Sequence, residues 1–185
     1  DGVVLRAPKE AGLYYGVQTL LQLLPPEVYS RTQVATPVTW ALPCVKIEDQ
    51  PRFVWRGLLL DTARHMFTKQ EIFDFIDVMA MHKLNTMHWH LNDDVGWRIE
   101  IKKYPKLVEV GAWRPDIMFG LDPNSSTFYG PDGRYGGFFT QQDIKEIVAY
   151  AADHFIAVVP EFEMPAHSEA SRRAYPELSC DDPPA

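Results

Sequence analysis

Cysteine is nearly absent from this sequence. Cys44 and Cys180 are the only two among 185 residues, and they form no Cys-x-x-Cys pair. This scarcity excludes a zinc ribbon and a thioredoxin-type redox motif, because both need paired cysteines at close spacing. We expect two unpaired, buried thiols, while one long-range disulfide stays open in case the protein is secreted.

Positive charge and long apolar runs are also in short supply. The chain has 18 Lys and Arg against 25 Asp and Glu, giving a net charge of −7. Binding to nucleic-acid phosphates needs clustered Lys and Arg, so we expect no nucleic-acid partner. No apolar run approaches the roughly 20 residues of a membrane span, so we expect no membrane partner. The chain begins with Asp1, which we interpret as a cut end, and a secreted, periplasmic or lysosomal location is favoured over a cytoplasmic one.

The sequence alternates between strand-like and helix-like segments. Strands are expected at residues 3–6, 57–61, 86–91 and 156–160, and helices at 12–24, after the capping pair Thr68 and Glu71, and after the capping pair Thr140 and Asp143. Continuous apolar strands separated by helices are typical of parallel units in an α/β protein. Residues 25–52 hold five prolines, which indicates a domain boundary.

Polar side chains follow each of the three central strands. They are Asp61 and Arg64, then Asp93 and Asp94, then Glu161, Glu163 and His167. In a parallel barrel all strands open on one face, so we expect these clusters to converge there. A complete (β/α)8 barrel needs roughly 250 residues. The chain is therefore expected to form either a small open sheet or the front part of a larger barrel.

One interpretation of the second cluster is a metal site. His88 and His90 share one side of their expected strand, so both could bind one ion with Asp93 or Asp94. Metal-dependent amidohydrolases begin their sites in this way, and that alternative stays open. Only His167 stands at further ligand spacing, so we favour histidines bonded to carboxylates or backbone and expect no metal and no cofactor.

Sugar binding is the other interpretation. Sugars are held by arginine and carboxylate contacts to their hydroxyls and by aromatic rings against their apolar faces. Arg64, Asp93, Trp89 and Trp97 supply these residue types near the expected strand ends. A non-catalytic sugar-binding module is therefore a second alternative.

Several longer motifs, in this order, resemble one enzyme family. They are RGLLLDTARH (56–65), KLNTMHWHLNDD (83–94), GWR (96–98), YPKL (104–107), GAWR (111–114), GGFFT (136–140) and PEFEMPAH (160–167). Together they look like the β-N-acetylhexosaminidases of glycoside hydrolase family 20. The resemblance implies the first three strands of a TIM barrel at 53–185, a linker at 28–52, and the end of a small α/β domain at 1–27.

The resemblance also implies roles for individual residues. Arg64 resembles the arginine that grips hydroxyls of the terminal sugar, with Asp61 as its support. Asp93 and His167 resemble the Asp–His pair behind the catalytic glutamic acid. His90 and Glu163 are expected in the surrounding shell. Ala166 departs from the family, which usually has glycine there.

Family members hydrolyse terminal β-linked N-acetylglucosamine or N-acetylgalactosamine, with the substrate's own acetamido oxygen as nucleophile. The expected partners are thus N-acetylhexosamine-containing glycans or chito-oligosaccharides, and the rest of the barrel from the same or a companion chain. The acid and the acetamido-orienting residue of the family form an adjacent Asp-Glu pair after the fourth strand. We expect that strand to follow Ala185, so these residues alone are predicted to be inactive.

Overall fold

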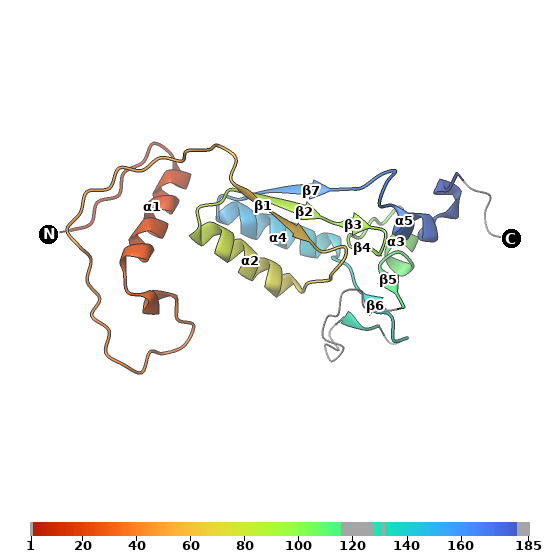
Figure 1. The fold of residues 1–185 in the computed structure, drawn as a ribbon, viewed down its shortest axis with the longest axis horizontal. Coiled ribbons are helices and arrows are strands. Elements are labelled where there is room, and N and C mark those ends of the chain that lie inside the picture. The colour runs from red at the N-terminus through yellow and green to blue at the C-terminus, as the bar shows by residue number, and fades with distance from the viewer. Residues whose placement is uncertain (1, 116–127, 131, 181–185) are drawn as a thin grey trace.

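The computed structural model describes residues 2–115, 128–130 and 132–180. Its main elements are arranged in two layers, a small sheet and the helices packed on it (Figure 1). The α-helices are α1 (Glu10–Leu23), α2 (Lys69–Met81), α3 (Lys106–Glu109), α4 (Gln141–Asp153) and α5 (Glu169–Ala174), and short 3-10 helices span Pro26–Tyr29 and Pro176–Leu178. The strands are β1 (Gly57–Asp61), β2 (Thr86–His90), β3 (Asn92–Asp93), β4 (Gly96–Trp97), β5 (Trp113–Arg114), β6 (Tyr135–Gly136) and β7 (Ala157–Glu161).

The central sheet is parallel, with the strand order β1-β2-β7. Its register pairs Asp61 with His90 and His90 with Glu161. The last residues of all three strands therefore lie side by side at one edge. The expected parallel α/β arrangement is confirmed, as is the convergence of the strand ends, and the fold agrees with the front part of a barrel.

Helices α2 and α4 cover one face of this sheet (Figure 1). Each begins with a reciprocal capping box: Thr68 with Glu71, and Thr140 with Asp143. These caps satisfy amide groups that the first turn of a helix leaves without partners. Between the helices and the sheet lies the main core, which includes Ile72, Ile76, Met79, Met87, Trp89 and Ile147.

The described residues between β2 and α4 form a second, smaller layer beside the strand ends. It contains the β3–β4 hairpin, the antiparallel pair β5–β6 and the helical turn α3. Its apolar cluster joins Trp97, Leu107 and Ala112 to Ala170 and Ala174 of α5. This packing holds α5 against α3 and the β3–β4 hairpin.

Helix α1 packs at the opposite end of the sheet. Gln22 Nε2 donates to the Met81 carbonyl at 3.0 Å, and Lys83 Nζ donates to Thr19 Oγ1 at 2.6 Å. The helix begins and ends within two residues of its expected bounds. Residues 30–56, all of them described, form neither helix nor strand.

Two expectations from the sequence are wrong. Residues 3–6 form no strand, because no strand of the described chain runs beside them, and Val3 and Val4 are 58% and 71% exposed. Cys44 and Cys180 are free, as expected, but both are exposed rather than buried. Among the described residues, no helix is long and apolar enough to cross a membrane.

Candidate active site

The turn after β1 fixes both the backbone and the side chain of Arg64. Asp61 Oδ1 accepts hydrogen bonds from the backbone amides of Ala63 and Arg64, each at 3.0 Å. The other oxygen, Oδ2, lies 2.5 Å from Nη1 of Arg64. This bond to Asp61 outweighs burial and raises the pKa of Arg64, with further help from the charges of Asp61 and Asp93. Asp61 therefore contacts both the backbone and the side chain of Arg64, and its support of a sugar-binding arginine stays a prediction.

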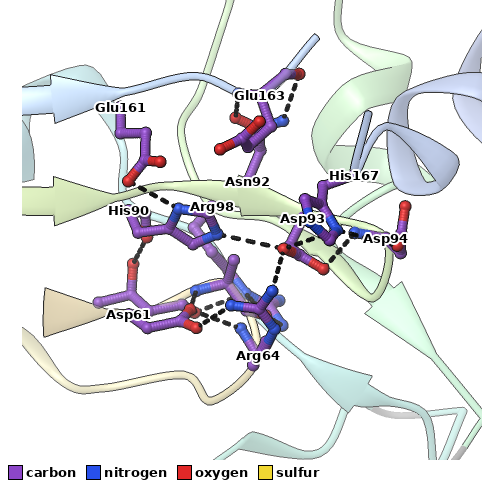
Figure 2. Close-up of polar contacts among 12 residues, drawn as sticks. Asp61, Arg64, His90, Asn92, Asp93, Asp94, Arg98, Glu161, Glu163 and His167 are labelled. Atoms are coloured by element: carbon purple, nitrogen blue, oxygen red, sulfur yellow. Dashed lines mark hydrogen bonds and ion pairs between the residues drawn. The ribbon is translucent and has the colours of Figure 1, made fainter. Parts of the chain in front are cut away.

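Asp93 brings the three strand ends together (Figure 2). Its Oδ2 lies 2.6 Å from Nη2 of Arg64, 3.3 Å from Nε2 of His90 and 3.5 Å from Nδ1 of His167. The side chain is only 4% exposed. A carboxylate this deeply buried needs such partners, since an unpaired buried charge is strongly unfavourable. The β3–β4 hairpin, in which Asp93 pairs with Gly96, holds it in place.

His90 and His88 both reach the same carboxylate on β7. Oε2 of Glu161 lies 2.9 Å from Nδ1 of His90 and 2.7 Å from Nε2 of His88. Burial acts to lower the pKa of His90, but Glu161, Asp61 and Asp93 together raise it above its ordinary value. Burial likewise opposes, without overcoming, the lowering of the pKa of Glu161 by its contacts with His90 and Glu163. The two histidines share one side of β2, as expected.

His167 follows β7 on a turn with left-handed backbone, at φ 47°. Non-glycine residues rarely adopt this conformation, and it recurs at functional sites. Its Nδ1 lies 3.3 Å from Asp94 Oδ2, slightly closer than to Asp93. Asp94 Oδ1 also accepts the backbone amide of Glu169 at the start of α5. Ala166 is not among the residues with positive φ, so glycine is not needed there.

Glu163 joins the site through its backbone. Asn92 Oδ1 accepts the Glu163 amide at 2.9 Å, and Asn92 Nδ2 donates to the Glu163 carbonyl at 3.2 Å. These two hydrogen bonds tie the chain that follows β2 to the chain that follows β7. Asn92 is 1% exposed and was not singled out from the sequence, although its place directly after a strand was a usable signal.

The candidate residues from the sequence therefore meet in one contiguous network. Ion pairs link Asp61, Arg64, Asp93, His90 and His167, and Glu163 lies beside them. The network also includes residues that were given no role in a sugar site. They are Asn92, Arg98 and Arg114, together with His88, Asp94 and Glu161, which the sequence placed at the strand ends.

Two groups of side chains have the spacing of a metal site. They are His90 with Glu161 and Glu163, and His167 with Asp93 and Asp94, each with ligand atoms within 4.8 Å of one another. In both groups the ring nitrogen nearest the carboxylates is already paired with them. Arg64 adds a cation against Asp93, which disfavours a second cation there. The donor set thus fits a histidine–carboxylate network, and we assign no ion to it.

Comparison with known proteins agrees with this geometry. Residues 53–185 match the family description "Glycosyl hydrolase family 20, catalytic domain", and residues 1–50 match "Glycosyl hydrolase family 20, domain 2". A β-hexosaminidase of Porphyromonas gingivalis is 47% identical over 97% of this chain, which spans 22% of that protein. An N,N'-diacetylchitobiase of Vibrio harveyi is 38% identical over 92% of this chain, which spans 19% of that protein.

Among solved structures, the chain resembles the Streptomyces plicatus N-acetyl-β-hexosaminidase in complex with Thio-NAglucal. The TM-score is 0.80 at 42% identity, covering 97% of this chain and 33% of that one. The chain thus spans a third or less of the length of each of these three relatives. Because the catalytic-domain match covers well over half of the sequence, the chain belongs to glycosyl hydrolase family 20.

Proposed function

We propose that this chain forms the sugar-binding front of a retaining exo-β-N-acetylhexosaminidase barrel. Its substrate class is a terminal β-linked N-acetylglucosamine or N-acetylgalactosamine. The observation that carries the proposal is the network around Arg64, at the aligned carboxyl ends of three parallel strands. In barrel enzymes, this end of the strands holds the active site.

Arg64 supplies the hydroxyl-binding group. Its contacts with Asp61 and Asp93 involve Nη1 and Nη2, and its side chain remains 40% exposed. A guanidinium has five N–H donors in a fixed plane, so donors remain for two neighbouring hydroxyls of a sugar. The two carboxylates fix that plane before the sugar arrives, which reduces the entropy lost on binding.

His167, with Asp93 and Asp94, supplies a group that adjusts the proton affinity of the catalytic acid. A histidine held at Nδ1 by a carboxylate presents Nε2 to a further group. In the proposed enzyme that group is the glutamic acid that protonates the leaving oxygen, while a preceding aspartate orients the acetamido group. The acetamido oxygen attacks the anomeric carbon, as in the substrate-assisted exception to the two-carboxylate scheme. The 185 residues contain no Asp followed directly by Glu.

Two polypeptides and two substrates test the proposal. A polypeptide in which this chain continues through the remaining barrel strands should hydrolyse a nitrophenyl N-acetyl-β-glucosaminide. It should not hydrolyse the corresponding glucoside, which lacks the acetamido nucleophile. Residues 1–185 alone should hydrolyse neither. Turnover of both sugars at similar rates by the longer polypeptide would contradict substrate assistance. Turnover by residues 1–185 alone would contradict the proposal that the catalytic Asp-Glu pair lies outside these residues.

A further inference from the structure

Arg98 is a completely buried arginine directly behind the Arg64 turn. It is 0% exposed, although arginine is almost never fully buried without a partner. Within the described part of the chain, the acceptors of its hydrogen bonds are all backbone carbonyls. They are Thr62 O at 3.0 Å, Ala63 O at 2.8 Å, Ala112 O at 2.6 Å and Gly137 O at 3.0 Å. Burial, followed by repulsion from Arg114, lowers the pKa of Arg98 to about 10, so it remains charged at neutral pH.

A second arginine completes the contacts on the same side of the turn. Arg114 is 6% exposed and donates from Nη2 to the Arg64 carbonyl at 2.9 Å. Its guanidinium carbon lies 4.7 Å from the centre of the Tyr135 ring, which limits its movement. Three successive carbonyls, those of residues 62, 63 and 64, therefore accept hydrogen bonds from two buried arginines.

The backbone amides of the turn are hydrogen-bonded as well. Asp61 accepts the amides of residues 63 and 64, so the turn is held through both its N–H and its C=O groups. The space behind it is also closed: a methyl group added at Gly96 would collide with the Arg98 guanidinium and with the Ala63 carbonyl. With its backbone fixed on both sides, Arg64 has little freedom except in its own side chain.

We infer that Arg98 and Arg114 are positioning residues that hold the 61–64 turn and thereby aim Arg64 at the substrate. The inference rests on the proposed function. Lysine cannot replace either residue, because an ammonium has three donors around a point and cannot span carbonyls from separate segments. Small displacements of a binding group are enough to reduce catalysis substantially.

A double-mutant cycle tests this inference in the longer polypeptide that includes the remaining barrel strands. Arg98→Lys should lower kcat/KM roughly 10- to 100-fold, mainly through KM. In an Arg64→Ala background, the same change should lower kcat/KM by less than about twofold, because the group that it positions is already absent. Arg31→Lys, at an exposed surface ion pair with Asp74, is the matched control and should leave kcat/KM unchanged in both backgrounds. An equal loss from Arg98→Lys with and without Arg64 would overturn the inference.

Hydrogen exchange gives a readout that does not depend on turnover. Arg98→Lys and, separately, Arg114→Lys should speed the exchange of amides 63 and 64 at least tenfold, without changing exchange in α4. Unchanged exchange in the turn would overturn the inference even if activity fell. If the wild-type polypeptide turned over no N-acetylhexosaminide, the proposed function would fail, and exchange alone would decide whether the arginines hold the turn.

Discussion

Replacing His90 tests whether the buried network depends on a charged histidine. The ring contacts Glu161 through Nδ1 at 2.9 Å and Asp93 through Nε2 at 3.3 Å, and its side chain is 7% exposed. The Asp93 contact has hydrogen-bond geometry, whereas Glu161 Oε2 lies at ion-pair distance without accepting a hydrogen bond within the described part of the chain. A proton on both ring nitrogens makes both contacts attractive, because each carboxylate then faces a positive charge. The raised pKa of His90 agrees with this charged form.

The size of the effect follows from burial. Removing one partner of a buried ion pair costs about 3–5 kcal/mol, because the other charge is left uncompensated. Glu161 is 27% exposed and keeps some hydration, so we expect the lower limit, about 3 kcal/mol, for His90→Leu. His90→Asn should lose less, since its amide can replace the ring at Nδ1 and donate to Glu161. His82→Leu, on an exposed histidine after α2, is the control and should change stability by less than about 0.5 kcal/mol.

The pH dependence of stability shows whether His90 is charged in the folded protein. A histidine whose pKa is raised on folding stabilises the protein fully below its unfolded pKa, about 6.5, and loses this effect as the pH rises through the folded value. The stability difference between wild type and His90→Leu should therefore be largest near about pH 6 and shrink toward about pH 9. Asp61, Arg64, His88, Asp93 and Glu161 are the charged or titratable groups around the ring. Urea unfolding of the longer polypeptide measures the difference, and a constant or growing difference across the range would refute a charged His90.

Three further predictions concern the rest of the molecule. Arg64→Ala should raise KM for a nitrophenyl N-acetyl-β-glucosaminide about 10- to 100-fold, because hydrogen bonds from a charged donor to the sugar are lost; an unchanged KM would remove Arg64 from the sugar site. Prolonged EDTA treatment should leave activity within about twofold of the untreated enzyme, because Arg64 and the histidines already pair with the carboxylates; a loss restored by zinc would favour the amidohydrolase interpretation. Thr68→Ala should lower stability by about 1 kcal/mol through loss of the α2 capping box, measured by thermal unfolding, whereas Thr68→Ser should retain most of it.

The strand ends were predictable because a short-range pattern determines them. A short apolar run that ends in a charged residue marks the point where a parallel strand leaves the core, and β1 matches its expected bounds at 57–61. The capping boxes of α2 and α4 were also predictable, since each is contained within four residues. The prediction of a strand at 3–6 was wrong. An apolar composition does not make a strand unless another strand lies beside it, and these residues lie exposed.

The arginines behind the turn could not be identified in the same way. Arg98 finds its acceptors at residues 62, 63, 112 and 137, which are separated by up to 75 positions in sequence. No local pattern distinguishes it from a surface arginine such as Arg31, which is 76% exposed. Only the folded arrangement of several loops shows that one of these side chains is buried and the other is solvated.

The two adjacent aspartates show how one peptide bond can couple two parts of the site. Asp93 ends β3 and Asp94 begins the turn after it, and both carboxylates reach Nδ1 of His167, but the sequence does not say which of the two is buried. Asp93 faces inward at 4% exposure and pairs with Arg64 and His90, whereas Asp94 is 40% exposed, contacts His167 and accepts the first amide of α5. A shift of the β3–β4 hairpin that moves one aspartate must therefore move the other. The orientation of Arg64 and the position of His167 are thus mechanically linked, although the two residues follow different strands.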